Sequence, residues 1–256
     1  MNKTVTRDVT ITDPTGKKST TTQTVTFTRG ATVDEVTNKV TYDDWSENGK
    51  HTFDKVDVPT VHGYTASGEV PEVVVTPETQ SSKVDITYTA NAQTAKITYI
   101  DDTEKKTLGS DTQNGKFNQA IIFEHNPAEV IKGLEEKGYK LVSDNFKPGI
   151  KYQNDNKLNI FEVHLVHTYE PVETSQTITE TVHYIDANGK PVAPDHVAKV
   201  VIKVTGTRDK VTDSITWNTP STGHFDEVIS PEVPNMTPDK KLIPGRDVQY
   251  GDSDIT

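Results

Sequence analysis

The chain has 256 residues, and 38 acidic against 27 basic side chains give it a formal net charge of −11 at pH 7. That charge argues against nucleic acid as a partner, because phosphates are neutralised by clustered Lys and Arg. The absence of cysteine excludes disulfides, thiol catalysis and Cys-ligated zinc. No apolar run reaches the roughly 20 residues that cross a bilayer, which argues against membrane insertion.

The first segment of the chain is predicted to open with a β-hairpin. Residues 9–12 alternate, and Asp13 to Gly16 (DPTG) has the composition of a type I turn followed by a left-handed Gly. The Asp side chain accepts hydrogen bonds from turn amides, and Gly adopts a positive φ at little cost. The Thr-rich stretch that follows, up to Thr28, suits a strand with one face in water.

Short helices are predicted further along both outer segments. Val33, Val36 and Val40 have helical spacing, and residues 208–215 align with that stretch. Residues 82–89 then alternate as a closing strand. The outer segments are therefore expected to be related, β-rich and β-grasp-like.

The middle of the chain is predicted to hold one helix between strands. Asn126 suits the N-cap, Pro127 the first helical position and Gly138 the C-terminal cap. Strands are predicted before the helix, around residues 95–100 and 117–123, and after it, around residues 139–142 and 161–169. This order predicts a ubiquitin-like β-grasp, in which one helix packs across a mixed sheet.

Residues 181–192 (TVHYIDANGKPV) pose a choice between a reactive cluster and a turn. His183 and Asp186 are three apart on an extended chain, so they start on opposite faces and converge poorly on one ion. Asp186 to Gly189 also repeats the turn composition of Asp13 to Gly16. The turn is the favoured interpretation.

The turn aspartate recurs along the chain as Asp13, Asp101 and Asp186. The interval of about 85 residues is typical of a domain array. The middle copy has Glu104 where the other two have Gly, so its turn must differ or be strained.

The repeat predicts three tandem small domains, at residues 1–90, 91–171 and 172–256. The strand that matches residues 82–89 only begins at residues 254–256, so the last strand of the third domain is expected to be truncated. The links are short, which favours an elongated, semi-rigid rod. The fold class is expected to be β-rich α+β.

These features together resemble the mucus-binding (Mub and MucBP) repeats of surface adhesins from Gram-positive bacteria. The resemblance rests on residues 97–102 (ITYIDD), 182–191 (VHYIDANGKP) and 237–245 (TPDKKLIPG), and it covers essentially the whole chain. It implies that the middle domain is the ubiquitin-like N-terminal half of a repeat. The outer domains would then correspond to the C-terminal half, a mucin-binding-type domain.

The resemblance also implies a function. Family members are extracellular and cell-wall-anchored, so the signal and anchor are expected outside this chain, and the chain is expected to be a monomer. The expected activity is weak, multivalent adhesion to host mucin glycoproteins and their glycans. Immunoglobulin binding and a stalk or spacer without a ligand of its own are the alternatives. The family offers no catalytic residues, so no enzyme is expected.

Candidate ligand-binding residues are the aromatic side chains, because an exposed ring can stack on a sugar face. Trp45 and the adjacent Asp44, which lie among polar neighbours, are the first candidates, and Tyr64 and Trp217 are further ones. Trp217 aligns with Tyr42, which favours a shared core position for those two residues.

No metal site or other cofactor is expected. His164 and His167 are three apart on a predicted strand and face opposite ways. Paired carboxylates such as Asp43-Asp44 are favoured in turns for local reasons. Calcium is the alternative, because hard oxygen ligands cluster there, but no segment has the spacing of an EF-hand loop.

Overall fold

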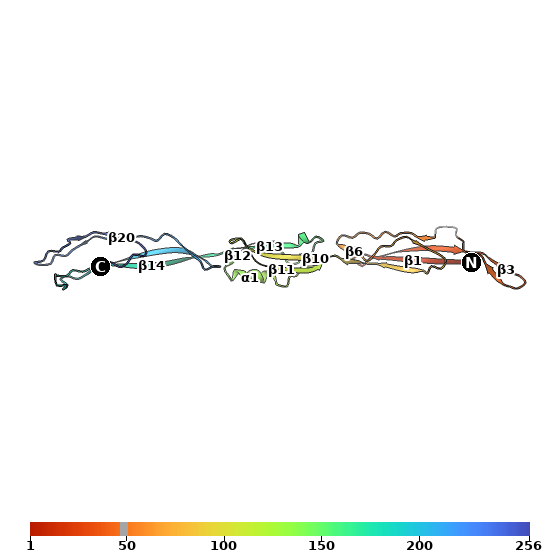
Figure 1. Ribbon diagram of the computed structural model, residues 1–256, viewed down its shortest axis with the longest axis horizontal. Coiled ribbons are helices and arrows are strands. Elements are labelled where there is room, and N and C mark those ends of the chain that lie inside the picture. Colours follow the sequence, from red (N-terminus) through yellow and green to blue (C-terminus); the bar gives the residue numbers. More distant parts are fainter. Residues whose placement is uncertain (47–50) are drawn as a thin grey trace. The chain divides into compact units, whose positions relative to one another are not determined.

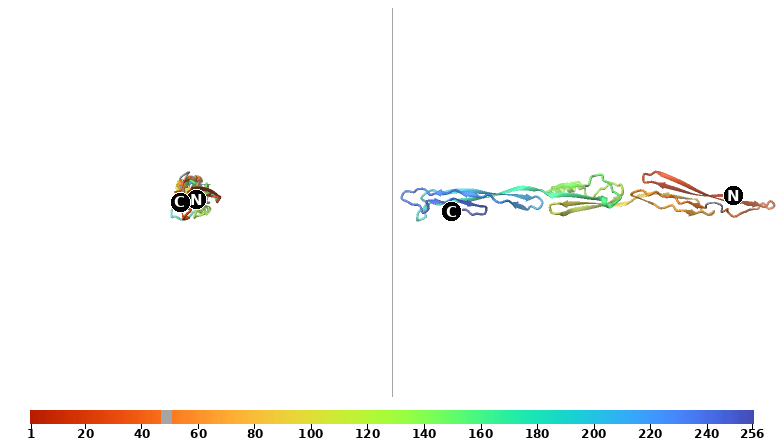
Figure 2. Two further views of the ribbon diagram at one scale, coloured as in Figure 1. Left: turned by 90° about the vertical axis from the view of Figure 1, so that its right-hand side faces the viewer. Right: turned by 90° about the horizontal axis from the view of Figure 1, so that it is seen from above.

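The computed structural model describes residues 1–46 and 51–256. The chain divides into two compact units, one of residues 1–99, 108–126 and 144–163, the other of residues 100–107, 127–143 and 164–256. We call residues 1–91, 92–168 and 169–256 the first, middle and third segments. Strands dominate each of them (Figure 1 and Figure 2).

The first segment contains β1 (Asn2–Thr12), β2 (Lys18–Thr28), β3 (Ala31–Val33), β4 (Val40–Tyr42), β5 (Thr52–Phe53), β6 (Tyr64–Ala66), β7 (Val73–Val74), β8 (Ser82–Ile86) and β9 (Tyr88–Ala90). The middle segment contains β10 (Ala92–Asp101), β11 (Lys106–Lys116), α1 (Pro127–Glu135), β12 (Tyr139–Asp144), the 3-10 helix η1 (Asn156–Asn159) and β13 (Ile160–His167). The third segment contains β14 (Tyr169–Val182), β15 (His196–Asp209), β16 (Ile215–Trp217), β17 (Gly223–Phe225), β18 (Val228–Ile229), β19 (Leu242–Ile243) and β20 (Arg246–Val248).

The predicted hairpin of the first segment is confirmed. β1 pairs antiparallel with β2, and β8 pairs parallel with the other edge of β1. Asp13 Oδ1 accepts hydrogen bonds from the backbone N–H groups of Thr15 and Lys17, and Gly16 has φ +90°. The turn therefore has the left-handed Gly that the sequence predicts.

The predicted helix at Val33–Val40 is wrong, because the chain forms the tight hairpin β3–β4 there. Asp34 Oδ1 accepts hydrogen bonds from the backbone N–H groups of Val36 and Thr37, and Asn38 adopts φ +57°. A left-handed residue ends any helical turn, so the chain reverses and the β-branched residues pair as strands.

The corresponding prediction in the third segment is wrong for the same reason. Asp209 Oδ1 accepts hydrogen bonds from the N–H groups of Val211 and Thr212, Asp213 adopts φ +60°, and β15 pairs with β16. The two hairpins are thus built alike, around Asp34 in the first segment and Asp209 in the third.

The middle segment forms a four-stranded sheet with the order β11-β10-β13-β12. Within the described residues the only α-helix is α1, which begins at Pro127 as predicted and buries Ile131. Gly138 follows it with φ +97°, as expected of a C-terminal cap. The turn after β10 differs from its two counterparts, because Lys105 is its left-handed residue, with φ +55°.

The third segment repeats the long hairpin of the first. β14 pairs antiparallel with β15 from Tyr169–Asp209 to Val182–His196. Asp186 Oδ1 accepts hydrogen bonds from the N–H groups of Asn188 and Lys190, and Gly189 has φ +80°. The interpretation of residues 181–192 as a turn is confirmed.

Each outer segment encloses a small apolar core between its long hairpin and the later short strands. Among the described residues of the first segment, one cluster contains Val5, Val25, Phe27, Phe53 and Val75, and another contains Val9, Val70 and Ile86. The third segment has one comparable cluster, of Ile178, Ile202, Phe225 and Val248.

Gly63 gives a test of close packing within the first compact unit. It has φ +79°, and a Cβ there would lie 2.1 Å from the ring of Phe117, which is itself contacted edge-on by His62 and Tyr64. We expect Gly63→Ala to lower the free energy of unfolding by about 2–4 kcal/mol, from strain at positive φ plus overpacking. Urea denaturation measures the change.

Gly149→Ala is the matched control. Gly149 has φ +88° with nothing within 4 Å of the added Cβ, so only the backbone strain of about 1 kcal/mol should remain. Equal losses in the two variants would contradict the packing role of Gly63.

Candidate functional site

Trp45 is packed, which corrects the expectation that its ring is exposed. It is half-buried and lies against the cluster that contains Phe27 and Phe53. The guanidinium carbon of Arg29 lies 4.5 Å from the centre of the Trp45 ring and 4.2 Å from that of Tyr42. The Trp45 ring is therefore engaged by a cation as well as by the core.

Tyr64 also has a packing partner. It is half-buried, and its ring meets the ring of Phe117 edge-on at 5.7 Å. Asp44 is exposed in the segment that follows β4. Tyr64 packs against Phe117, whereas Trp45 packs against Arg29, so these two predicted residues have different contact partners.

Tyr42 and Trp217 are not core residues, and the expectation of a shared core position is wrong. Tyr42 is 50% exposed and Trp217 is 45% exposed. They do occupy equivalent places, since Tyr42 pairs with Ala31 at the end of β3–β4 and Trp217 pairs with Gly206 in β15–β16. A Cβ on Gly206 would lie 2.7 Å from Trp217 Cε3, so the indole rests on the glycine backbone.

A buried polar cluster centres on His167, in the second compact unit. His167 Nδ1 lies 2.6 Å from Asp209 Oδ2, and its Nε2 lies 2.9 Å from Asp101 Oδ2. The His167 side chain is 1% exposed, and the ring of Tyr139 meets it edge-on at 5.4 Å. The imidazole thus joins the end of the middle segment to the β15–β16 hairpin.

The surroundings of His167 favour its charged form. Burial lowers the pKa of His167, but the hydrogen bonds to Asp209 and Asp101 outweigh burial and raise it above its usual value. Burial raises the pKa of each carboxyl, but the hydrogen bond from His167 and two backbone N–H donors to each carboxylate together outweigh burial, so both carboxyl pKa values are lowered. A protonated imidazole between two carboxylates is a charge-assisted arrangement.

The same junction is held by backbone contacts. Thr168 donates from both N–H and Oγ1 to the Gly138 carbonyl, and Lys210 N–H donates to the Thr168 carbonyl. A Cβ on Gly138 would lie 2.7 Å from the Lys210 carbonyl carbon. The close approach of these two backbones requires glycine at position 138.

The cluster also offers three possible metal ligands. One ligand atom each from Asp101, Glu104 and His167 lies within 4.8 Å of the other two. Both His167 nitrogens are already bonded to carboxylates, and Lys106 Nζ is paired with Glu104 and lies 4.0 Å from Asp101. The Lys106 ammonium thus lies beside the same carboxylates that a metal ion would bind. These side chains form a network of ion pairs.

His164 and His167 have separate partners, as their predicted opposite orientations require. His164 Nδ1 lies 3.1 Å from Asp102, whereas His167 contacts Asp101 and Asp209. Sequence reasoning missed the His167 cluster, because its partners lie 42 and 66 residues away. The alternation of residues 161–169 was the available signal, since it places His167 on the buried face of β13.

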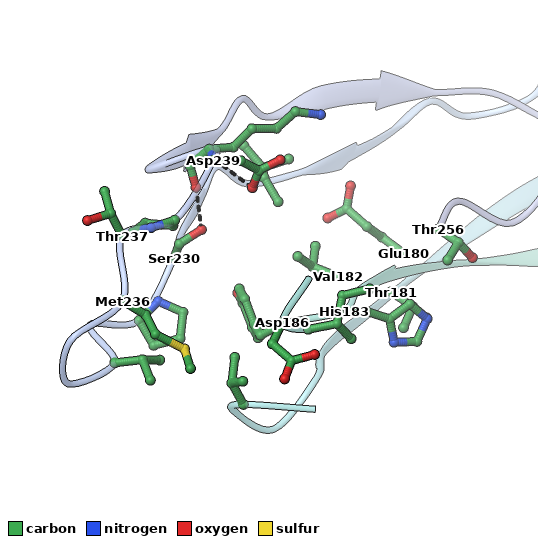
Figure 3. Close-up of a pocket in the computed structure, with 18 of the residues that line it drawn as sticks. Glu180, Thr181, Val182, His183, Asp186, Ser230, Met236, Thr237, Asp239 and Thr256 are labelled. Atoms are coloured by element: carbon green, nitrogen blue, oxygen red, sulfur yellow. Dashed lines mark hydrogen bonds between the residues drawn. The ribbon is translucent and has the colours of Figure 1, made fainter. Parts of the chain in front are cut away.

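A groove of about 1060 Å³ lies in the third segment, between the end of β14 and the loop after β18 (Figure 3). Val182 and Met236 lie on opposite walls, with Glu180 and Thr256 at one end. His183 Nδ1 pairs with Asp195 at 2.9 Å, not with Asp186. No reactive cluster of His183 and Asp186 is therefore formed.

Residues 1–92 and 169–256 match the Muc B2-like domain family, and residues 93–167 match the family described as Mucin binding domain. The chain belongs to the Muc B2-like domain family. Together, the Muc B2-like match and the mucin binding domain match identify the chain as a mucus-binding repeat. They confirm the resemblance found in the sequence. Both families are adhesin domains and neither is a family of enzymes.

Solved structures give the same relationship. This mucus-binding repeat is similar to the crystal structure of Mub-RV, with 33% identity over 64% of this chain and 94% of that one, and a TM-score of 0.58. The type 2 repeat of the mucus binding protein MUB from Lactobacillus reuteri is 29% identical over the same shares, with a TM-score of 0.46. The mucin-binding domain of Spr1345 from Streptococcus pneumoniae is 32% identical over 34% of this chain and 88% of its own, with a TM-score of 0.33.

The likeness to Mub-RV agrees with the observed β-rich fold. No curated protein sequence matches the chain. Among the described residues no helix has the length and apolar character to cross a membrane.

His167 gives a test of the junction between the middle and third segments. We expect His167→Ala to lower the free energy of unfolding by about 3–5 kcal/mol, because two buried carboxylates lose their cationic partner. Since the folded pKa of His167 is raised, its contribution is fully present below pH 6.5 and is lost as pH rises through the folded value. The difference between wild type and variant in urea denaturation should therefore shrink at alkaline pH.

His224→Ala is the matched control. His224 pairs with Asp247 at 2.7 Å, but its side chain is 54% exposed, so its removal should change stability by less than about 1 kcal/mol. A His167→Ala loss as small as that of the control, or one that does not change with pH, would contradict the charged cluster.

Proposed function

We propose that the chain is an extracellular adhesion module that binds mucin glycans weakly and gains affinity through repetition. The observation that carries the proposal is the pair of family matches, which together span residues 1–167 and 169–256. The relatives support it, since two of them are described as mucus-binding or mucin-binding. Attachment to a cell wall belongs to the same proposal.

The proposed organisation is three tandem domains, at residues 1–90, 91–171 and 172–256, with a ubiquitin-like β-grasp in the middle. The edges of the family matches, at residues 92–93 and 167–169, support these boundaries. The single helix α1 between β11 and β12 of one four-stranded sheet supports the β-grasp. Repeated small domains suit adhesion, because each added copy contributes another contact.

Trp217 is the proposed stacking residue. One side of its indole rests on Gly206, yet 45% of the residue remains exposed. A flat aromatic surface held on a rigid strand suits a sugar ring, which presents an apolar face and hydroxyls at its edge. Trp45 and Tyr64 are less suited, because Arg29 and Phe117 already contact their rings.

Immunoglobulin binding is the second candidate, and one observation favours it. β11 and β12 lie at the two edges of the middle sheet, where an incoming strand can pair with free backbone groups. A stalk without a ligand of its own is the remaining alternative, and it predicts no binding to mucin at all.

Replacing the proposed stacking residue should weaken adhesion. We expect Trp217→Ala to reduce binding to immobilised mucin about fivefold, which corresponds to about 1 kcal/mol for one aromatic contact. Tyr250→Ala is the control, because Tyr250 is a comparably exposed aromatic of the same segment, at 44%. Equal binding by the two variants would remove Trp217 from the site.

Tandem copies should adhere far more strongly than a single copy. Linking two weak sites turns the second binding event into an intramolecular one, so retention on a mucin surface should rise by about 100-fold or more. Surface plasmon resonance on one and two copies of the chain measures this. Retention that merely doubles would contradict multivalent binding.

A further inference from the structure

The contact between the β15–β16 hairpin and the end of the middle segment depends on one imidazole ring. All of its residues belong to the second compact unit. His167 Nε2 lies 2.9 Å from Asp101 Oδ2 of the middle segment, and His167 Nδ1 lies 2.6 Å from Asp209 Oδ2 of the hairpin. The two carboxylates therefore face different nitrogens of the same ring.

The other oxygen of each carboxylate already has partners of its own. Asp101 Oδ1 accepts hydrogen bonds from the backbone N–H groups of Thr103 and Glu104, at 2.9 and 3.2 Å. Asp209 Oδ1 accepts them from two amides of its hairpin, at 2.8 and 3.3 Å. Each carboxylate is thus fixed to its own turn, and Oδ2 is the oxygen that the imidazole contacts.

The number of protons on the ring decides how many of these contacts are hydrogen bonds. An imidazolium has two N–H groups and donates to both carboxylates, whereas a neutral imidazole has one N–H group and one lone pair. The His167 side chain is 1% exposed, so a lone pair that faces a carboxylate oxygen there is repulsive and unsatisfied. Loss of one proton therefore removes one of the two contacts.

Asp209 is the carboxylate that can leave the ring. The Asp101 side chain is 0% exposed and keeps Lys106 Nζ at 4.0 Å. The Asp209 side chain is 12% exposed, and among the described residues its only ion-pair partner is His167. Because Asp209 Oδ1 holds two hairpin amides, movement of this carboxylate toward water displaces that part of the hairpin as well.

The charged and titratable side chains that face the ring come from the elements packed around it. They are Asp101 of β10, Glu104 and Lys106 after it, Tyr139 of β12 and Asp209 of β15. Glu104 and Lys106 pair with each other, so the charge of His167 is the one that balances the aspartates. Loss of that charge leaves excess negative charge in a buried site, which also favours opening.

We propose that this contact is a pH-sensitive joint. The joint is closed while His167 carries two ring protons, and it loosens when the pH rises and one proton leaves. The backbone hydrogen bond from Lys210 N–H to the Thr168 carbonyl, which crosses the joint, then opens more often. The inference goes beyond the proposed adhesion and does not depend on it.

Amide exchange measured by NMR tests the joint. The imidazole nitrogen shifts of His167 mark the pH at which the ring loses a proton. Across that pH the protection factor of Lys210 N–H should fall by at least about tenfold, because a charge-assisted hydrogen bond that holds the joint is lost. The Asn91 amide is the internal control and should keep its protection, since it bonds to the Gly63 carbonyl in the other compact unit.

Asp209→Asn is the variant that tests the role of the ring proton. Its side-chain oxygen can keep the hairpin amides while its NH2 group donates to the lone pair of a neutral His167. The protection factor of Lys210 N–H should therefore stay within about twofold over the same pH range. Asp247→Asn, which alters the exposed pair with His224, is the matched control and should show the wild-type fall.

His167→Gln provides a second test that does not alter the hairpin turn. Gln is uncharged at every pH, so the protection factor of Lys210 N–H should be low and independent of pH. A ring that keeps both protons up to about pH 10 would overturn the proposal, as would Lys210 protection that does not change when the proton leaves. An equal fall in wild type and Asp209→Asn, or a wild-type fall in His167→Gln, would overturn it as well.

Discussion

The pairing register of two long hairpins underlies the structure of both outer segments. β1–β2 and β14–β15 each bury one face, so a slip of one residue would move every apolar side chain of that face into water. Asp13 and Asp186 fix the register, because each carboxylate binds two amides of its turn. The short strands that complete each core add to this framework.

Much of this framework could be predicted because it is encoded locally. The DPTG and DANG turns and the N-terminal end of α1 depend on residues within a few positions of one another, and all three are confirmed. The predicted helices failed because the helical spacing of Val33, Val36 and Val40, with which residues 208–215 align, favours a helix less strongly than a left-handed residue and strand pairing favour a hairpin. Asn38 and Asp213 were the local signals of a turn in the sequence, because Asn and Asp tolerate the left-handed conformation that both adopt.

The candidate site was harder to predict, because exposure and ring contacts are tertiary properties. Trp45 stands among polar residues in the sequence, yet Arg29 and an apolar cluster contact its ring. Trp217 aligns with another aromatic residue, yet it lies on a strand surface over Gly206. The His167 cluster brings together Asp101, His167 and Asp209, which are far apart in the chain, and no local sequence pattern predicts such a contact.

The proposed adhesion of this mucus-binding repeat depends on Trp217, an exposed aromatic side chain on β16 that we propose stacks on a sugar ring. The most direct test is surface plasmon resonance of the purified chain over immobilised mucin, before and after enzymatic removal of the mucin glycans. The account predicts weak, saturable binding that is lost with the glycans. Binding that survives deglycosylation, or no binding to intact mucin, would contradict it.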